Sequence, residues 1–217
     1  MNQAKMHNIS SSMSFQKNSL SDNNNIEKRM RSFTESTPPS DDLKESYNII
    51  KHYLNNLDEN CLKASFNKAN VFCHFDLHSF NVLWVHDEPV IIDFDDFCFE
   101  SPENDLMYSV WHWTRNHFPQ NDTLSQAQKE IATSYLRSYL SNRGCALKSE
   151  ELLFALDLIG VRIMIYEYFR AIKINDASQL KVQLLELINW TGNLKGIVAD
   201  YFDEEKCFWR ACYVFYM

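Results

Sequence analysis

Residues that favour tight turns are scarce in this sequence. It contains only four Gly and five Pro among 217 residues, although these two residue types most often interrupt helices and strands. Hydrophobic residues make up 45% and aromatic residues 14% of the chain, which is enough to bury a sizeable core. The composition therefore predicts a compact domain that is rich in helix and has few tight turns.

Basic surface, long apolar runs and paired cysteines are also lacking. Asp and Glu number 29 against 21 Lys and Arg, a formal net charge of -8, whereas proteins that bind nucleic acid need a basic stripe. No apolar run approaches the length of a membrane-spanning helix, and the N-terminus lacks the features of a signal peptide. The six Cys contain no Cys-x-x-Cys pair, which argues against a zinc ribbon or a disulfide scaffold. We expect a cytoplasmic protein without nucleic-acid or membrane partners.

Residues 1–40 lack glycine and show no sustained apolar period. Such a segment exposes too little apolar surface to offset chain entropy, so we predict that it is a disordered polar leader. Residues 41–217 are expected to form one compact domain. Within it, apolar residues recurring at intervals of three and four predict helices over 41–57, 105–118, 126–142 and 149–174, with a further helix from Ser178.

Two β-rich runs stand in the middle of the chain. Asn81–Val85 and Val90–Phe94 are separated by four residues that include Asp and Pro, and this pattern predicts a β-hairpin. A hairpin brings the start of its first strand close to the end of its second, so Asn81 and Asp93 become neighbours. Asp76 lies in the loop before Asn81. Two carboxylates and one amide oxygen are thus expected at a common point, where such hard ligands suit Mg²⁺ bound with substrate phosphates.

Three short segments around this hairpin resemble the aminoglycoside phosphotransferase and choline kinase-like family, relatives of the protein kinases. They are His74–Asn81 (HFDLHSFN), residues 91–95 (IIDFD) and residues 101–106 (SPENDL). The resemblance implies an α+β fold, namely a mainly helical C-terminal lobe of a protein-kinase-like fold with a catalytic-loop hairpin. It also implies a kinase that transfers a phosphoryl group to a small-molecule hydroxyl, with ATP or GTP and Mg²⁺ as cofactors.

The resemblance further implies a chemical role for each matching position. Asp76 would be the catalytic base that accepts the proton of the acceptor hydroxyl. Asn81 and Asp93 would hold Mg²⁺ against the nucleotide phosphates, and Asp95 would either assist this metal site or stay solvated.

Two further positions are implied to be structural rather than chemical. His74 would shape the catalytic loop, and Asp105 would brace that loop from the following helix. The loop departs from the family at Phe75, where many members have Gly, and at residues 79–80, where many have a Pro-Gly pair.

The segment before the catalytic loop departs further from the family. A nucleotide-binding lobe with a strand Lys and a helix Glu normally precedes this loop, and residues 1–40 show no such pattern. The resemblance is seen only between about residues 41 and 200, so the N-terminal lobe is expected to be missing. Two interpretations remain open. The chain is an active phosphotransferase whose missing lobe comes from a partner chain or a homo-oligomer, or it is a catalytically inactive kinase-like binding module or gene remnant.

A third interpretation is a hydrolase that depends on a transition metal. Its ligands would be alternating residues of an extended segment plus one residue that completes the site. They are His74, Asp76 and His78, with Asp93, Asp95 or His112.

Overall fold

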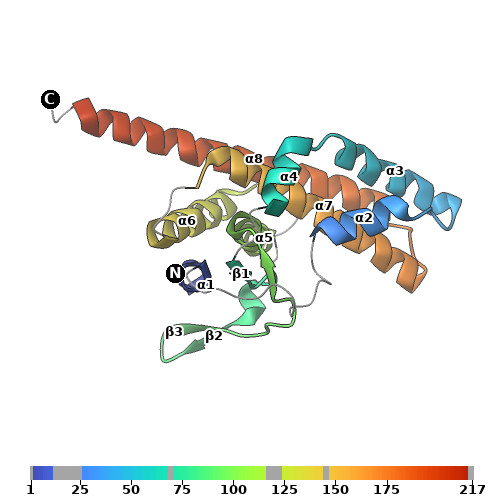
Figure 1. Ribbon diagram of the computed structural model, residues 1–217, viewed down its shortest axis with the longest axis horizontal. Coiled ribbons are helices and arrows are strands. Elements are labelled where there is room, and N and C mark those ends of the chain that lie inside the picture. Colours follow the sequence, from blue (N-terminus) through green and yellow to red (C-terminus); the bar gives the residue numbers. More distant parts are fainter. Residues whose placement is uncertain (1, 12–25, 68–70, 116–123, 144–146, 215–217) are drawn as a thin grey trace.

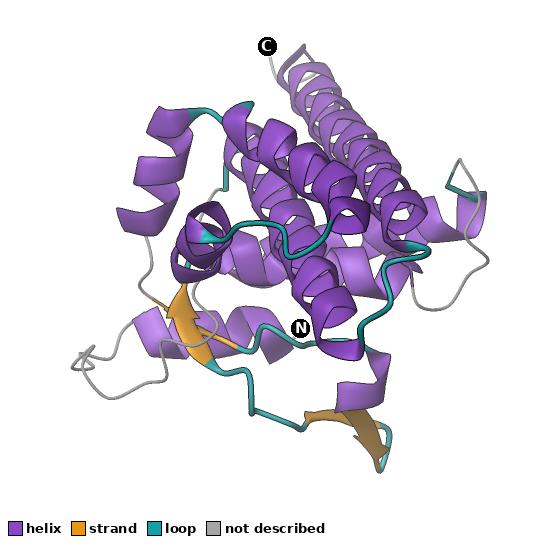
Figure 2. Ribbon diagram, turned by 90° about the vertical axis from the view of Figure 1, so that its right-hand side faces the viewer, coloured by secondary structure: helices purple, strands orange, loops and turns teal. Residues whose placement is uncertain are grey.

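The computed structural model describes residues 2–11, 26–67, 71–115, 124–143 and 147–214. In chain order, these residues form α1 (Asn2–Ser11), α2 (Ile26–Glu35), α3 (Asp41–Asn55), α4 (Glu59–Asn67), β1 (Val71–Cys73), a short 3₁₀ helix (Ser79–Asn81), β2 (Val82–Val85), β3 (Glu88–Ile91), β4 (Cys98–Glu100), α5 (Pro102–Arg115), α6 (Gln126–Arg143), α7 (Ser149–Ile174) and α8 (Leu180–Val214). The fold is α+β and mainly helical, as the sequence predicted (Figures 1 and 2). None of the described helices combines the length and apolar character needed to cross a membrane.

Helix α7 lies at the centre of the helical body. It packs against α2, α3, α4, α5 and α8, and its fully buried side chains include Leu156, Ile159 and Tyr168. A helix that is apolar on nearly every side is buried in this way. Helices α7 and α8 approach closely at Gly160, where a Cβ would lie 3.0 Å from Thr191 Oγ1. This helical body supports the small sheets, which lie on one side of it (Figure 2).

The helices predicted over 41–57, 105–118, 126–142 and 149–174 are confirmed within the described residues, with ends that differ by a few residues; residues 116–118 of the second helix lie outside the described ranges. Helix α4 and the pairing of β1 with β4 were not predicted. These two strands are antiparallel, with Val71 opposite Glu100 and Cys73 opposite Cys98. They are only three residues long, too short for a period of two to be recognised.

The predicted hairpin is present, but its turn is shorter than expected. Strands β2 and β3 pair from Val82 opposite Ile91 to Val85 opposite Glu88. The connection is therefore the two residues His86 and Asp87, with φ values of 50° and 63°. Positive φ at both positions belongs to the type I′ turn, whose twist suits a two-residue hairpin. Pro89, expected in the turn, lies in β3, where a sheet of two strands tolerates a missing N–H.

The described part of residues 1–40 contains two packed helices where a disordered leader was predicted, and residues 1 and 12–25 of that leader lie outside the described residues. Helix α1 packs against α6 and β1, and helix α2 packs against α7. Ile26 and Phe33 bury the apolar face of α2. The buried face of α1 is mostly polar, with Gln3 and His7 fully enclosed. A search for apolar periodicity does not detect such a face, because its side chains are buried through hydrogen bonds rather than apolar contact.

Candidate active site

The loop between β1 and β2 carries the residues predicted to be catalytic. Phe75, near its start, has a φ of 58°, in the left-handed region that bulky residues rarely adopt. The Phe75 amide donates a hydrogen bond of 2.8 Å to Asp105 Oδ1, and its carbonyl accepts one of 3.2 Å from Arg162 Nη1. Its ring is fully buried. The residue that precedes Asp76 is therefore held in an unfavourable conformation by contacts on both sides.

His74 connects this loop to the end of the hairpin. Its Nδ1 accepts a hydrogen bond of 3.3 Å from the backbone nitrogen of Asp76, so its Nε2 carries a proton and donates to the Ile92 carbonyl at 2.8 Å. The Ile92 amide in turn donates to the Asn81 carbonyl at 3.0 Å. Both ring nitrogens of His74 thus make hydrogen bonds with backbone atoms. These two bonds fix the position of the loop relative to the hairpin.

Asp76 and Asn81 are brought into direct contact. Asn81 Nδ2 donates hydrogen bonds of 2.8 Å to the Asp76 carbonyl and 2.9 Å to its carboxylate. Tyr108 donates to Asp76 Oδ1 at 3.4 Å. Burial raises the pKa of Tyr108 to about 12, so its hydroxyl keeps the proton. The Asp76 side chain is 30% exposed, and its carboxylate is therefore positioned by neighbours yet open to a ligand.

Asp93 comes directly after Ile92, whose amide and carbonyl both bind residues of the catalytic loop. It has a φ of 60°, and its side chain is exposed, like that of Asp95. Because Asn81 Nδ2 is committed to Asp76, Oδ1 is the Asn81 atom that can bind a cation. An amide oxygen and exposed carboxylates are ligands that Mg²⁺ accepts. The residues present therefore fit a Mg²⁺ site at this end of the hairpin.

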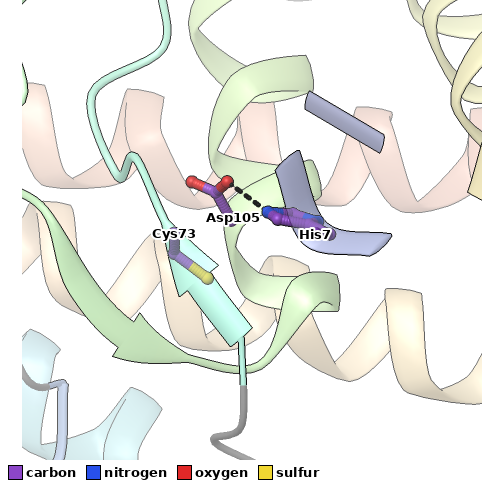
Figure 3. A group of neighbouring side chains, drawn as sticks. All are labelled: His7, Cys73 and Asp105. Atoms are coloured by element: carbon purple, nitrogen blue, oxygen red, sulfur yellow. Dashed lines mark hydrogen bonds and ion pairs between the residues drawn. The ribbon is translucent and has the colours of Figure 1, made fainter. Parts of the chain in front are cut away.

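A closed network of polar side chains surrounds Asp105, next to the catalytic loop. The Asp105 Oδ2 atom accepts a hydrogen bond of 2.9 Å from Gln3 Nε2 and lies 2.8 Å from His7 Nε2 (Figure 3). His7 Nδ1 contacts the Tyr139 hydroxyl. Burial acts to raise the pKa of Asp105, but the hydrogen bonds from His7, Gln3 and the Phe75 amide together hold that pKa below its usual range. Asp105 is therefore charged at neutral pH although it is fully buried.

Cys73 lies beside this network and completes a group of three possible metal ligands. The ligand atoms of His7, Cys73 and Asp105 lie within 4.8 Å of one another. Burial raises the pKa of the Cys73 thiol well above its ordinary value, and the thiol donates to the Glu100 carbonyl at 3.5 Å. A protonated thiol is a poor metal ligand. With their hydrogen bonds made inside the protein, these three residues form part of the core that supports the loop.

The transition-metal site predicted for a hydrolase is not assembled. Within the described ranges, the group of His7, Cys73 and Asp105 is the only set of three His, Cys or carboxylate ligands that lies close together. His74 uses both ring nitrogens on backbone atoms. His78 Nδ1 accepts a hydrogen bond of 3.2 Å from the Phe80 amide, and its Nε2 lies 3.4 Å from Asp76 Oδ2. His74 therefore shapes the loop, and His78 also contacts the carboxylate of Asp76.

A polar cavity of about 680 Å³ opens beside Asp76 and is lined by residues of α2, α5 and α7. Three arginines line it, Arg29, Arg115 and Arg162. The guanidinium of Arg162 lies 4.4 Å from the centre of the Phe75 ring, and its Nη2 is 3.8 Å from Asp96 Oδ2. These arginines were not predicted, because they come from distant helices and share no local spacing.

Comparison with protein families agrees with the resemblance carried by His74–Asn81. The sequence model of the phosphotransferase enzyme family (APH) matches residues 3–139, more than half of the chain. The match includes α1 and α2, whereas the sequence motifs indicated a resemblance only from about residue 41. A comparison with curated proteins found none that matches. The catalytic loop, the hairpin and Asp105 all lie inside the matched span, and the chain belongs to the phosphotransferase enzyme family.

Proposed function

We propose that this chain transfers a phosphoryl group from Mg²⁺-bound ATP or GTP to the hydroxyl group of a small molecule. The observation that carries this proposal is the grouping of Asp76, Asn81 and Asp93 around one loop and one hairpin. Phosphoryl transfer needs little covalent chemistry from the protein. It needs an acceptor held in line with the phosphate and cations that offset the phosphate charge.

Each residue of this group has a distinct task. Asp76 orients the acceptor hydroxyl and accepts its proton, with Tyr108 and Asn81 fixing the two carboxylate oxygens. Asn81 Oδ1 and the Asp93 carboxylate would hold Mg²⁺, which offsets the charge of the nucleotide phosphates when bound, and Asp95 is a further candidate ligand. Asp105 acts at a distance, through the Phe75 amide.

A bound nucleotide also needs groups that cover its phosphates. The described residues before Val71 form the helices α1 to α4, whereas the usual nucleotide-binding lobe contributes a strand Lys. We propose that a partner chain, or a second copy in a homo-oligomer, supplies these groups. The same helices favour a second candidate function, a catalytically inactive kinase-like module that binds a ligand or partner.

Thermal unfolding separates the two candidates. The midpoint is measured with Mg²⁺ alone and with Mg²⁺ plus ATP or GTP, since a ligand that binds only the native state raises it. A rise that requires both metal and nucleotide, and that disappears in Asp93→Ala, supports the phosphotransferase. Asp95→Ala is the matched control on the same exposed segment, and a loss there would add Asp95 to the metal ligands. No rise at millimolar nucleotide favours the inactive module.

Turnover tests the assignment of Asp76. Asp76→Ala is expected to lower kcat by orders of magnitude with nucleotide binding largely kept, because it removes the group that positions and deprotonates the acceptor. If Asp76→Ala and Asp93→Ala both behave as the parent protein in both assays, these residues are not the reacting site.

A further inference from the structure

The hairpin of β2 and β3 lies at the edge of the molecule and is apolar on both faces (Figures 1 and 2). Seven of the eight residues in its strands are apolar, and the exception is Glu88. Trp84 is 70% exposed and Leu83 is 48% exposed. A two-stranded hairpin is marginally stable by itself, and it is normally stabilised by a third strand or by packing of an apolar face. The exposed apolar surface therefore points to a further strand beside this hairpin.

The outer edge of β2 carries backbone groups that are open to pairing. The Ile92 amide donates to the carbonyl of Asn81, which lies directly opposite. Because hydrogen-bonded and non-hydrogen-bonded pairs alternate along an antiparallel ladder, the backbone groups of Val82 and Trp84 point away from β3. The Val82 amide donates to the Ser79 carbonyl. Within the described residues, the Val82 carbonyl and the amide and carbonyl of Trp84 make no hydrogen bond.

The outer edge of β3 is unsuited to pairing. Pro89 lies opposite Trp84, so its backbone nitrogen takes the same outward position on the other strand. Pro has no N–H to donate there, and within sheets it is confined to such edges. Strand β3 also carries the charge of Glu88, whereas β2 has no charged residue. A further strand is therefore directed to β2, and the sheet still ends at β3.

We propose that two copies of this chain associate through β2, which pairs antiparallel with β2 of the second copy about a two-fold axis at Trp84. Each Trp84 amide donates to the Trp84 carbonyl of the other copy, so one edge supplies both the donors and the acceptors. Because β2 is uncharged, the pairing brings no like charges opposite one another in the two strands. The sheet then has four strands, and Pro89 at both outer edges opposes the addition of more. A second copy therefore closes the contact as a dimer.

An apolar groove on one face of the hairpin accommodates the second copy. The groove has a volume of about 810 Å³ and is lined by Trp84 and Ile91 of the hairpin and by Trp113 and Tyr135 of α5 and α6. Residues directly opposite in a sheet point to the same face, so the indole of the second copy lies on the groove face, beside Trp84. Cross-strand aromatic pairs are stabilising. The contact is small, and we expect a dissociation constant of about 10–100 μM.

Sedimentation of the full chain at increasing concentration tests the dimer. Trp84→Pro removes the outward N–H but no hydrogen bond between β2 and β3, whereas Trp84→Val loses the same indole and keeps the N–H. We expect the parent to dimerise, and Trp84→Pro to have a dissociation constant at least about tenfold higher than that of Trp84→Val. Val90→Lys is the control on β3, because Val90 is 42% exposed on the same hairpin, and it should dimerise as the parent does.

Opposite charges test the position of the two-fold axis. Trp84→Lys and Trp84→Glu each place like charges opposite one another, so each should dimerise at least about tenfold more weakly than the parent. An equimolar mixture should contain more dimer than either variant alone, because the mixed pair brings opposite charges together. Equal amounts of dimer in the mixture and in the separate variants would show that Trp84 is not at the axis, and would overturn the proposal.

Three further results would each overturn this interface. The parent chain could stay monomeric up to about 1 mM, a result that needs no variant to fold. Trp84→Pro and Trp84→Val could dimerise equally, or Val90→Lys could lose the dimer as Trp84→Pro does. The outcome is independent of the phosphotransferase test. A dimer that gives no response to Mg²⁺ and nucleotide keeps the interface and removes the transfer reaction, whereas a monomer that responds through Asp93 keeps the reaction and removes the interface.

Discussion

Asp105 and Arg162 both hold the backbone of Phe75, yet they lie in very different surroundings. The carboxylate accepts the Phe75 amide and the guanidinium donates to its carbonyl, and both residues are buried. Asp105 is enclosed with Gln3 and His7, so its carboxylate is held by hydrogen bonds within the protein. Arg162 lines a cavity with two further arginines and with the carboxylates of Asp76, Asp96 and Glu167. Charge on one side of the Phe75 peptide is enclosed in the core, whereas charge on the other side lies along an open cavity.

Removal of one carboxylate from each side of the Phe75 peptide, Asp105 or Asp96, gives the largest expected difference in the free energy of unfolding. Asp105→Ala leaves the partners of a buried charged network unpaired and is expected to lower the free energy of unfolding by about 3–5 kcal/mol. Asp96→Ala removes a carboxylate that is 42% exposed and 3.8 Å from Arg162, and the expected loss is below about 1 kcal/mol. Urea unfolding followed by circular dichroism measures both values. Similar losses in the two variants would abolish the distinction between the two sides.

The contribution of α1 to the enclosed side is tested through His7. His7→Ala removes one buried partner from each of Asp105 and Tyr139, and we expect a loss of about 1–3 kcal/mol. His52→Ala, an exposed histidine on α3, is the control and should change stability little. Because His7 and Asp105 act as one network, the double variant should lose less than the sum of the single losses. Strict additivity would contradict the network.

Asp105 on the enclosed side and His112 on the cavity side are expected to make stability depend on pH over different ranges. The pKa of Asp105 in the folded state lies below its unfolded value, so its stabilisation is complete above about pH 4 and is lost as the pH falls through the folded-state pKa. His112 has a folded-state pKa lowered to about 3 from 6.5, with burial the main cause. Between pH 6.5 and about pH 3, His112 is protonated in the unfolded chain but not in the folded protein. The free energy of unfolding therefore falls as the pH drops through this range.

The effect of His112 can be measured separately at pH values above those at which Asp105 titrates. Between about pH 6 and pH 5, stability should fall by up to about 1.4 kcal/mol per pH unit through His112. His112→Phe should flatten this slope. Urea midpoints measured across this range give the slopes. An unchanged slope in His112→Phe would show that this ring is not held uncharged in the fold.

Local signals explain how much of the site could be predicted. The hairpin and the order of Asp76, Asn81 and Asp93 follow from two β-rich runs and the polar residues beside them. The turn was misplaced because Pro89 was taken as a turn residue, whereas β3 has no third strand that needs its N–H. The conformation of Phe75 could not be predicted, because its positive φ depends on partners 30 and 87 residues away in the chain.

The features that could not be predicted are polar, and their residues come from distant parts of the sequence. His7 meets Asp105 across 98 residues of sequence, and no period within α1 marks it as buried. The cavity arginines come from helices that only the tertiary fold brings together. Arg29 in particular lies in the segment predicted to be a disordered leader. Hydrophobic periodicity finds apolar faces, so a helix buried through hydrogen bonds and a pocket lined by charges both escape it.

The smallest change in stability is expected for Arg29, on the cavity side of the Phe75 peptide. Arg29→Gln removes a charge that is repelled by Arg162 and attracted by Asp96, and we expect the free energy of unfolding to change by less than about 0.5 kcal/mol. A partly buried charge on which repulsion and attraction act together contributes little net stability. Urea unfolding at low salt measures the change, with Arg31→Gln as the control on the same helix. A loss as large as that of His7→Ala would mean that Arg29 supports the fold, and the two sides of the catalytic loop would then use their charges alike.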